Sequence, residues 1–153
     1  MSGLYYEDFA VGDEFITPSR TVTEADIVLF AGLSGDYNPL HTDEEFAKQT
    51  PFGGRIAHGL LGLSIASGLQ ARLGVLDGTV IAFLGLTWSF KGPVRAGDTI
   101  KLRMKTVEKR ASSKPGRGVV KFALSVVNHR GDVVQEGEQV IMLVAKEAGA
   151  NRV

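Results

Sequence analysis

The second half of the chain is a series of apolar stretches separated by turn-forming clusters, and it predicts a sheet. The stretches are rich in Val, Ile, Leu, Phe and Thr and predict four strands, over residues 79–91, 99–108, 118–128 and 133–145. Because the connections are short, consecutive strands should be antiparallel. Strict alternation of apolar and polar positions fails in residues 121–127 and 140–144, which indicates that both faces of the sheet are partly covered.

The first half of the chain predicts a strand and two helices ahead of its most apolar segment. Residues 14–22 alternate moderately and favour a strand. Thr23 is a suitable N-cap for a helix that should end at Gly32 and Gly35, because glycine readily adopts the backbone conformations that stop a helix. A short helix is expected over residues 43–48, which begin with acidic side chains, as the helix dipole prefers.

The most apolar segment lies over residues 58–73 and predicts a buried helix. No charged residue occurs from Gly59 through Ala71, and small residues are frequent, so neighbouring backbone should approach closely on several sides. The segment is too short to cross a bilayer, which takes about 20 apolar residues, so no membrane span is predicted. The expected fold class is α+β, with an antiparallel sheet wrapped around a long central helix.

Length and composition narrow the classes of function. The 153 residues suffice for one domain, and we expect a single domain over residues 1–153 with a polar tail over residues 146–153. Seventeen basic and 17 acidic side chains cancel, which argues against a nucleic-acid partner. The absence of cysteine excludes disulfides and thiolate metal sites and fits a reducing compartment. Since the first residues lack the pattern of a secretory signal, a cytoplasmic protein is expected.

The segment over residues 35–41 concentrates the candidate chemistry. Pro39 disfavours a helical backbone at the preceding residue, and the other residue types here form turns, so we expect a loop that is not helical. This loop would hold the carboxylate of Asp36 and the imidazole of His41, five residues apart, as an acid–base pair for proton transfer. The structural alternative is an Asx turn at Asp36 and a helix cap at His41. For Asn38 we expect a bond to its own turn.

These residues also resemble those of a known family. Residues 35–41, followed by Asp43 and residues 46–47, and then residues 54–59, closely resemble the signature of the MaoC-like hydratases, which include the (R)-specific enoyl-CoA hydratases. Residues 93–99 are similar to a strand-turn-strand segment of that family. The resemblance covers nearly the whole chain, and it implies the hot-dog fold, in which an antiparallel sheet wraps around a long central helix.

The resemblance further implies an activity and roles for individual residues. It implies hydration of a trans-2-enoyl-CoA to a 3-hydroxyacyl-CoA, or the reverse dehydration, with Asp36 and His41 as the catalytic pair. The backbone N–H of Gly59 would bind the thioester oxygen, and a serine of the central helix, Ser67 or Ser64, would support the pair. The substrate would be an acyl-CoA or acyl-carrier-protein thioester, and no separate cofactor is expected because coenzyme A is part of the substrate. A homodimer joined through its sheets is also expected.

Two other functions stay open on the sequence. A hot-dog thioesterase would need a carboxylate on or beside the central helix, and none occurs between Gly59 and Ala71. In a non-catalytic subunit that binds acyl thioesters, Asp36 and His41 would be dispensable. The histidines are scattered, at positions 41, 58 and 129, so no metal site is predicted. The side chain at position 58 could cap the helix, line a pocket or simply pack.

Overall fold

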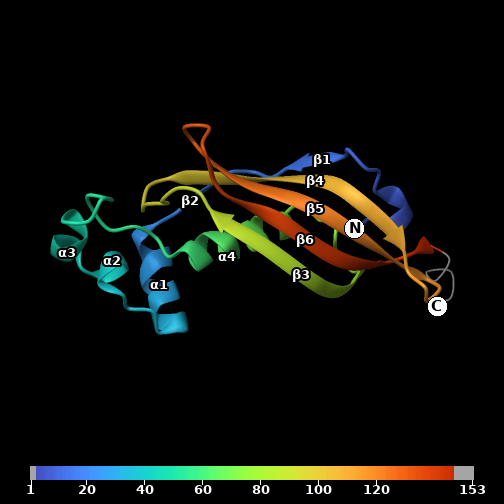
Figure 1. The fold of residues 1–153 in the computed structure, drawn as a ribbon, viewed down its shortest axis with the longest axis horizontal. Coiled ribbons are helices and arrows are strands. Elements are labelled where there is room, and N and C mark those ends of the chain that lie inside the picture. Colours follow the sequence, from blue (N-terminus) through green and yellow to red (C-terminus); the bar gives the residue numbers. More distant parts are fainter. Residues whose placement is uncertain (1–2, 147–153) are drawn as a thin grey trace.

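The structure, a computed structural model, describes residues 3–146 and consists of one antiparallel sheet with a long helix against one face (Figure 1). The strands are β1 (Glu14–Ile16), β2 (Arg20–Thr21), β3 (Val80–Phe90), β4 (Thr99–Ala111), β5 (Arg117–Asn128) and β6 (Val133–Val144). The helices are the 3-10 turn η1 (Tyr6–Asp8) and the α-helices α1 (Glu24–Ser34), α2 (Pro39–Thr42), α3 (Glu44–Lys48) and α4 (Gly59–Ala71). The predicted α+β class, an antiparallel sheet with a central helix, is confirmed.

The sheet has the order β1-β4-β5-β6-β3, and the two-residue strand β2 also pairs with β4. Strands β4, β5 and β6 are consecutive neighbours, and every pairing is antiparallel, as predicted. Strand β3 pairs with β6 rather than with β4, so the chain crosses the β5–β6 pair between Phe90 and Thr99. As a result, β3 is an edge strand with one neighbour among the described residues.

The strand predicted over residues 14–22 is divided into two short strands. Both β1 and β2 pair with β4, but Pro18 lies between them and has no N–H to donate to the ladder. Thr17 spans the interruption, because its N–H donates to the Leu102 carbonyl at 3.0 Å and its Oγ accepts from the Leu102 N–H at 2.9 Å. The prediction of one continuous strand is therefore corrected.

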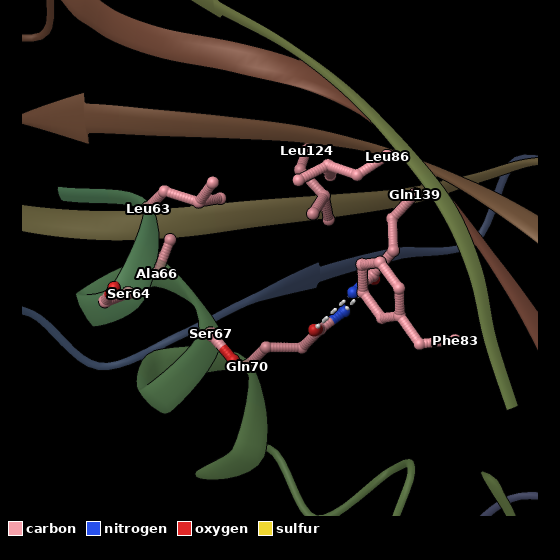
Figure 2. Close-up of a pocket in the computed structure, with 9 residues that line it drawn as sticks. All are labelled: Leu63, Ser64, Ala66, Ser67, Gln70, Phe83, Leu86, Leu124 and Gln139. Atoms are coloured by element: carbon pink, nitrogen blue, oxygen red, sulfur yellow. Dashed lines mark hydrogen bonds between the residues drawn. The ribbon is translucent and has the colours of Figure 1, made fainter. Parts of the chain in front are cut away.

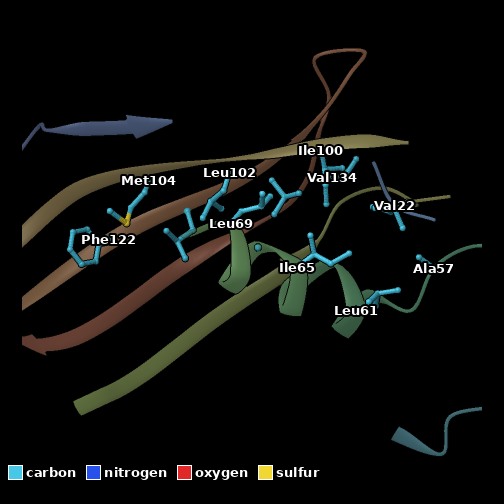
Figure 3. Close-up of a cluster of buried hydrophobic side chains, with 14 of the residues drawn as sticks. Val22, Ala57, Leu61, Ile65, Leu69, Ile100, Leu102, Met104, Phe122 and Val134 are labelled. Atoms are coloured by element: carbon cyan, nitrogen blue, oxygen red, sulfur yellow. The ribbon is translucent and has the colours of Figure 1, made fainter. Parts of the chain in front are cut away.

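The hydrophobic core fills the space between α4 and the inner face of the sheet (Figure 3). Leu61, Ile65 and Leu69 recur every four residues on the helix, so they share the face that meets the sheet. The strands β4 and β5 bury alternate residues against it: Ile100, Leu102, Met104, Phe122, Leu124 and Val126. Burial of each such side chain contributes about 1.5–3 kcal/mol, so this layer fixes the helix on the sheet.

Helix α4 is buried on one face, although the sequence predicted burial on nearly every face. The buried residues are Leu61, Gly62, Ile65, Ala66, Leu69 and Gln70. On the outer face, Leu60 is 59% exposed, and Ser64 and Ser67 are also exposed. The outer positions hold mostly serine and glycine, which need no burial, so an uncharged helix does not require cover on all sides.

Helix α1 begins at the predicted cap and ends at one of the two predicted glycines. The Asp26 N–H donates to Thr23 Oγ, and the Thr23 N–H donates to the Asp26 carboxylate, which together form a capping box. Gly32 lies inside the helix. Gly35 ends it with a φ of +77°, a left-handed conformation that residues with a Cβ rarely adopt. Gly35 therefore sets the direction in which the chain leaves the helix.

The predicted polar tail falls mostly outside the described part of the chain. Residues 147–153 are not described, and the first residue of the tail, Lys146, forms an ion pair with Asp8. Among residues 3–146, no helix is both long enough and apolar enough to span a bilayer.

Candidate functional site

In the turn after α1, side-chain oxygens accept hydrogen bonds from backbone N–H groups two residues further along the chain. The Asn38 N–H donates to Asp36 Oδ1 at 3.1 Å, and the Leu40 N–H donates to Asn38 Oδ1 at 3.0 Å. The bond predicted for Asn38 is therefore present, and it caps α2. The prediction that this loop is not helical is wrong for its second half. Proline is well suited to the first turn of a helix, so Pro39 starts α2 instead of preventing it.

His41 lies on α2, and a carbonyl fixes its ring. Its Nδ1 is 2.7 Å from the Ile56 carbonyl oxygen. Because a carbonyl oxygen only accepts, Nδ1 carries the hydrogen in the neutral ring and Nε2 keeps its lone pair. His41 thus has one nitrogen committed to the protein and one available to accept a proton. It does not cap the following helix, since Asp43 Oδ1 accepts the Phe46 N–H at the start of α3.

His58 is packed against the acid–base pair. It is only 2% exposed, and its ring stacks on that of His41 with centroids 3.9 Å apart and planes 29° apart. A second ring, that of Phe30, lies 4.9 Å away. The Nε2–H donates to the backbone carbonyl of Asp36 at 2.9 Å. Although His58 occupies the N-cap position of α4, its side chain makes no capping bond. Of the three alternatives, packing describes it, together with a bond to Asp36 that the sequence did not predict.

The fold brings three polar side chains together at this point. One carboxylate oxygen of Asp36 and one ring nitrogen each of His41 and His58 all lie within 4.8 Å of one another. The proximity of Asp36 and His41 agrees with the sequence, but His58 is 17 residues beyond His41 and no local signal placed it here. The cluster combines an exposed carboxylate with two imidazoles that are buried or partly buried.

The same cluster contains residue types that bind metals, but its geometry does not favour a shared ion. His41 Nδ1 and His58 Nε2 already bond to carbonyl oxygens. The three candidate ligand atoms are up to 4.8 Å apart, and a metal would need ligand atoms that converge on one point at about 2.0–2.1 Å. The absence of a metal site stays a prediction.

Gly59 opens helix α4 beside this cluster. Among residues 3–146, its backbone N–H has no hydrogen-bond acceptor, as expected for the first turn of a helix. The Phe90 ring covers its Cα, and a Cβ at this position would lie 2.7 Å from Phe90 Cε1. Its carbonyl accepts from Gln135 Nε2 at 3.1 Å, and Gln135 Oε1 in turn accepts from Trp88 Nε1 at 3.0 Å. A side chain at position 59 would therefore displace the Phe90 ring, and the carbonyl of Gly59 is held by the sheet.

A cleft of about 510 Å³ passes this glycine. Its lining is largely apolar and includes Ala57, Leu60, Phe90, Pro93 and Val94. A free N–H at the positive end of a helix, next to an apolar cleft, is a suitable place for a carbonyl oxygen that gains negative charge.

Neither serine predicted to support the pair forms a hydrogen bond with it in the described part of the chain. Ser64 Oγ donates to the Leu60 carbonyl at 2.8 Å, and Ser67 makes no hydrogen bond within the described part of the chain. Both line a separate cavity along α4 (Figure 2). The supporting role of Ser67 therefore stays a prediction.

The segment over residues 55–58 connects the helices of the site. The Arg55 guanidinium bonds Glu24 at the start of α1 through two nitrogens, at 2.6 and 3.2 Å, and Glu44 of α3 at 2.8 Å. These bonds raise the pKa of Arg55 and lower the pKa of the Glu44 carboxyl. The Ile56 carbonyl accepts the His41 bond, and His58 bonds to the turn at Asp36. Three residues of this segment, Arg55, Ile56 and His58, therefore fasten α1, the turn, α2 and α3 to the start of α4.

Comparisons with known proteins bear on this arrangement. Residues 8–128 match the family described as MaoC like domain. The chain is 36% identical over 146 residues to the 3-hydroxybutyryl-CoA dehydratase of Methylorubrum extorquens, covering 94% of this chain and 87% of that protein. It is 37% identical over 143 residues to the (R)-specific enoyl-CoA hydratase of Rhodospirillum rubrum, covering 93% of each. A solved structure of a monoamine oxidase regulatory protein from Archaeoglobus fulgius superposes with a TM-score of 0.89 at 39% identity, covering 95% and 97% of the two chains.

Proposed function

Since the chain belongs to the MaoC-like dehydratase and (R)-specific enoyl-CoA hydratase family, which has the hot-dog fold, we propose that it hydrates trans-2-enoyl-CoA to (R)-3-hydroxyacyl-CoA or catalyses the reverse dehydration. One observation carries the proposal: a carboxylate oxygen of Asp36 and a ring nitrogen of His41 lie within 4.8 Å of each other beside the first turn of α4. The separation suits two groups that hold one water molecule between them.

The proposed reaction uses that water as both nucleophile and proton source. Its oxygen forms a bond to C3 of the enoyl thioester while one of its protons passes to the Asp36–His41 pair, and the pair delivers a proton to C2. The lone pair on His41 Nε2 and the carboxylate of Asp36 are both able to accept from the water. Because both new bonds come from one side, the addition is syn, and the configuration at C3 follows from the face presented to the water.

Gly59 is the proposed site for the thioester oxygen. Negative charge develops on that oxygen when water attacks C3, and a fixed N–H at the positive end of a helix stabilises it. The chain offers the unpaired Gly59 N–H at the start of α4, next to an apolar cleft for the thioester. Loss of one such donor typically lowers kcat by about 10²–10³-fold.

We also propose a homodimer in which two β3 strands pair edge to edge. The strand has β6 as its one neighbour among the described residues, and its apolar side chains are exposed, with Phe83 at 56% and Leu84 at 46%. A long apolar edge strand is a ready template for pairing with another chain.

The function is tested with crotonyl-CoA and longer trans-2-enoyl-CoAs, whose conjugated double bond loses its absorbance on hydration. We expect wild-type protein to consume them, and an (R)-specific 3-hydroxyacyl-CoA dehydrogenase, but not an (S)-specific one, to oxidise the product. Asp36→Asn and His41→Ala should each lower kcat by about 10²–10⁴-fold, the usual contribution of a positioned acid or base.

Asp43→Asn is the matched control, because asparagine also caps helices and Asp43 serves as the cap of α3. It should retain activity. Retained hydration in both Asp36→Asn and His41→Ala would exclude the mechanism, and release of free thiol without hydration would identify a thioesterase instead.

A further inference from the structure

A second cavity runs along α4 and is distinct from the cleft at Gly59. It has a volume of about 370 Å³ and lies between the helix and strands β3, β5 and β6 (Figure 2). Its walls are mainly apolar, formed by Leu63, Ala66, Phe83, Leu86 and Leu124. Among the described residues, no lysine, arginine, aspartate or glutamate lines it. Such a cavity suits an uncharged, mostly apolar group.

Two buried glutamines form a polar wall in this apolar cavity. Gln70 of α4 and Gln139 of β6 are each 6% exposed. Gln70 Nε2 donates to Gln139 Oε1 at 2.7 Å, and Gln139 Nε2 donates to Gln70 Oε1 at 3.2 Å, as the dashed lines in Figure 2 show. Gln70 Nε2 also donates to Met104 Sδ at 3.0 Å. The two amides therefore hold each other in a fixed orientation.

The pair does not use all of its hydrogen-bonding capacity. Each amide offers two N–H donors and an oxygen with two lone pairs. Gln70 has spent both donors, but the second N–H of Gln139 has no acceptor within residues 3–146, and each amide oxygen has accepted one hydrogen bond. Every amide nitrogen and oxygen of the pair makes at least one hydrogen bond, and one N–H and one lone pair on each oxygen remain without a partner among the described residues.

The geometry of α4 and β6 links this cavity to the proposed reaction centre. Gly59, Leu63, Ala66 and Gln70 recur at helical spacing on one side of α4, and Gln70 lies about 16 Å along the axis from Gly59. Strand β6 runs alongside and places Gln135 and Gln139 on one face, with Gln135 bonded to the Gly59 carbonyl. The two cavities share no lining residue, but both lie along this side of α4, so an extended chain whose thioester oxygen is at Gly59 would need about 16 Å of length to reach the amide pair.

We propose that this cavity receives the far end of the acyl chain, and that the Gln70–Gln139 pair selects a chain ending in an uncharged hydrogen-bonding group, such as a hydroxyl or a ketone. The inference rests on the proposed function and adds a substrate class to it. A methyl end would leave the spare amide groups buried without partners, whereas a hydroxyl can donate to one and accept from another. A carboxylate would find no cation in the cavity lining.

The test compares trans-2-enoyl-CoAs of increasing length with counterparts that carry a terminal hydroxyl. At the length that reaches the pair, wild-type kcat/KM should favour the hydroxyl-ended substrate by about 10- to 100-fold. The double variant Gln70→Leu/Gln139→Leu should reverse this ratio. Because the ratio compares two substrates on the same protein, a general loss of activity does not affect it.

Thermal unfolding provides the folding control. Each single leucine variant leaves one amide without its partner and should unfold at a lower temperature than the double variant. Asp43→Asn changes a residue that does not line the cavity, so it should keep the wild-type substrate ratio.

The outcomes separate this inference from the proposed function. If wild-type protein hydrates no enoyl thioester, the proposed function fails. If it hydrates them but the ratio is the same in wild type and in the double variant, the inference about the glutamines fails. If the double variant changes the association state and leaves the ratio unmoved, a second copy of the chain covers the cavity, which also overturns the inference.

Discussion

His58 holds the proposed catalytic pair in place without having to touch the substrate. Its ring stacks on His41, and its Nε2–H holds the Asp36 carbonyl. Both contacts come from a side chain that is almost fully buried, so the positions of the two groups are coupled through one rigid ring. We therefore regard His58 as a positioning residue.

His58→Phe keeps an aromatic ring but removes the N–H that holds Asp36. We expect kcat to fall by about 10²-fold, the order of loss that a misplacement of about 1 Å can cause, with little change in KM. His58→Gln, which retains a side-chain N–H donor, should be intermediate. Phe30→Leu removes the other ring contact and leaves the bond intact, so it serves as the control. A fall in melting temperature with unchanged kcat would show a structural role alone.

Among the helices, the site depends on how α1, α2 and α3 are fastened to the start of α4. Arg55 binds carboxylates at the start of α1 and within α3, while the adjacent Ile56 carbonyl accepts the His41 bond. Guanidinium geometry allows one side chain to bind two carboxylates at once, which an ammonium group does less well. These bonds explain why short helices with few buried residues can still hold Asp36 and His41 in fixed positions.

Arg55→Ala should lower the melting temperature by a few degrees at most, since the pairs are largely exposed, and Arg55→Lys should recover part of the loss. The difference in melting temperature between wild type and Arg55→Ala should depend on pH. Arg55 lowers the pKa of Glu44 below its ordinary 4.5, so the stabilisation is present above pH 4.5 and is lost as pH falls through the lower, folded value. Thermal unfolding over a pH series measures this.

Arg103→Ala removes an exposed arginine that forms no ion pair in the described part of the chain, and it should leave the melting temperature nearly unchanged. A difference between Arg55→Ala and wild type that persists unchanged at low pH would contradict the carboxylate explanation.

At the scale of the whole molecule, strand β3, which has one neighbour among residues 3–146, predicts assembly. Strand β3 ends the strand order, and apolar side chains along it remain exposed. Natural proteins usually protect such edges with charge, proline or a bulge, and β3 has register shifts near Val80 and Phe83 but no charged residue from Val80 to Phe90. Pairing with the β3 strand of a second copy would give the backbone N–H and C=O groups of this edge hydrogen-bond partners.

Leu84→Lys should therefore weaken the proposed dimer by at least about tenfold, since it places a charge on the pairing strand. Val11→Lys changes a 63%-exposed valine away from this edge and is the matched control. Light scattering coupled to size-exclusion chromatography measures the association state. A wild-type protein that is monomeric at high concentration would contradict the proposal.

Local sequence signals predicted a large part of the fold. The Thr23 cap, the Gly35 turn and the cores of the four long strands were all predicted, because each depends on neighbouring residues. Helix α2 was not predicted because proline disfavours a helical backbone at the residue before it, which here is Asn38. Proline is also well suited to the first turn of a helix, and α2 begins at Pro39.

The amino-acid sequence alone specifies the four long strands, helix α1, the buried helix α4 and the closeness of Asp36 and His41, since five residues and a turn leave little freedom. The tertiary structure adds the contacts between residues that lie far apart along the chain. It stacks His58 on His41, sets the Phe90 ring against Gly59 and joins Gln70 to Gln139, 69 residues away. These contacts form only when the helices and the sheet pack together, because packing depends on the shapes of all the surfaces that meet and not on local backbone preference.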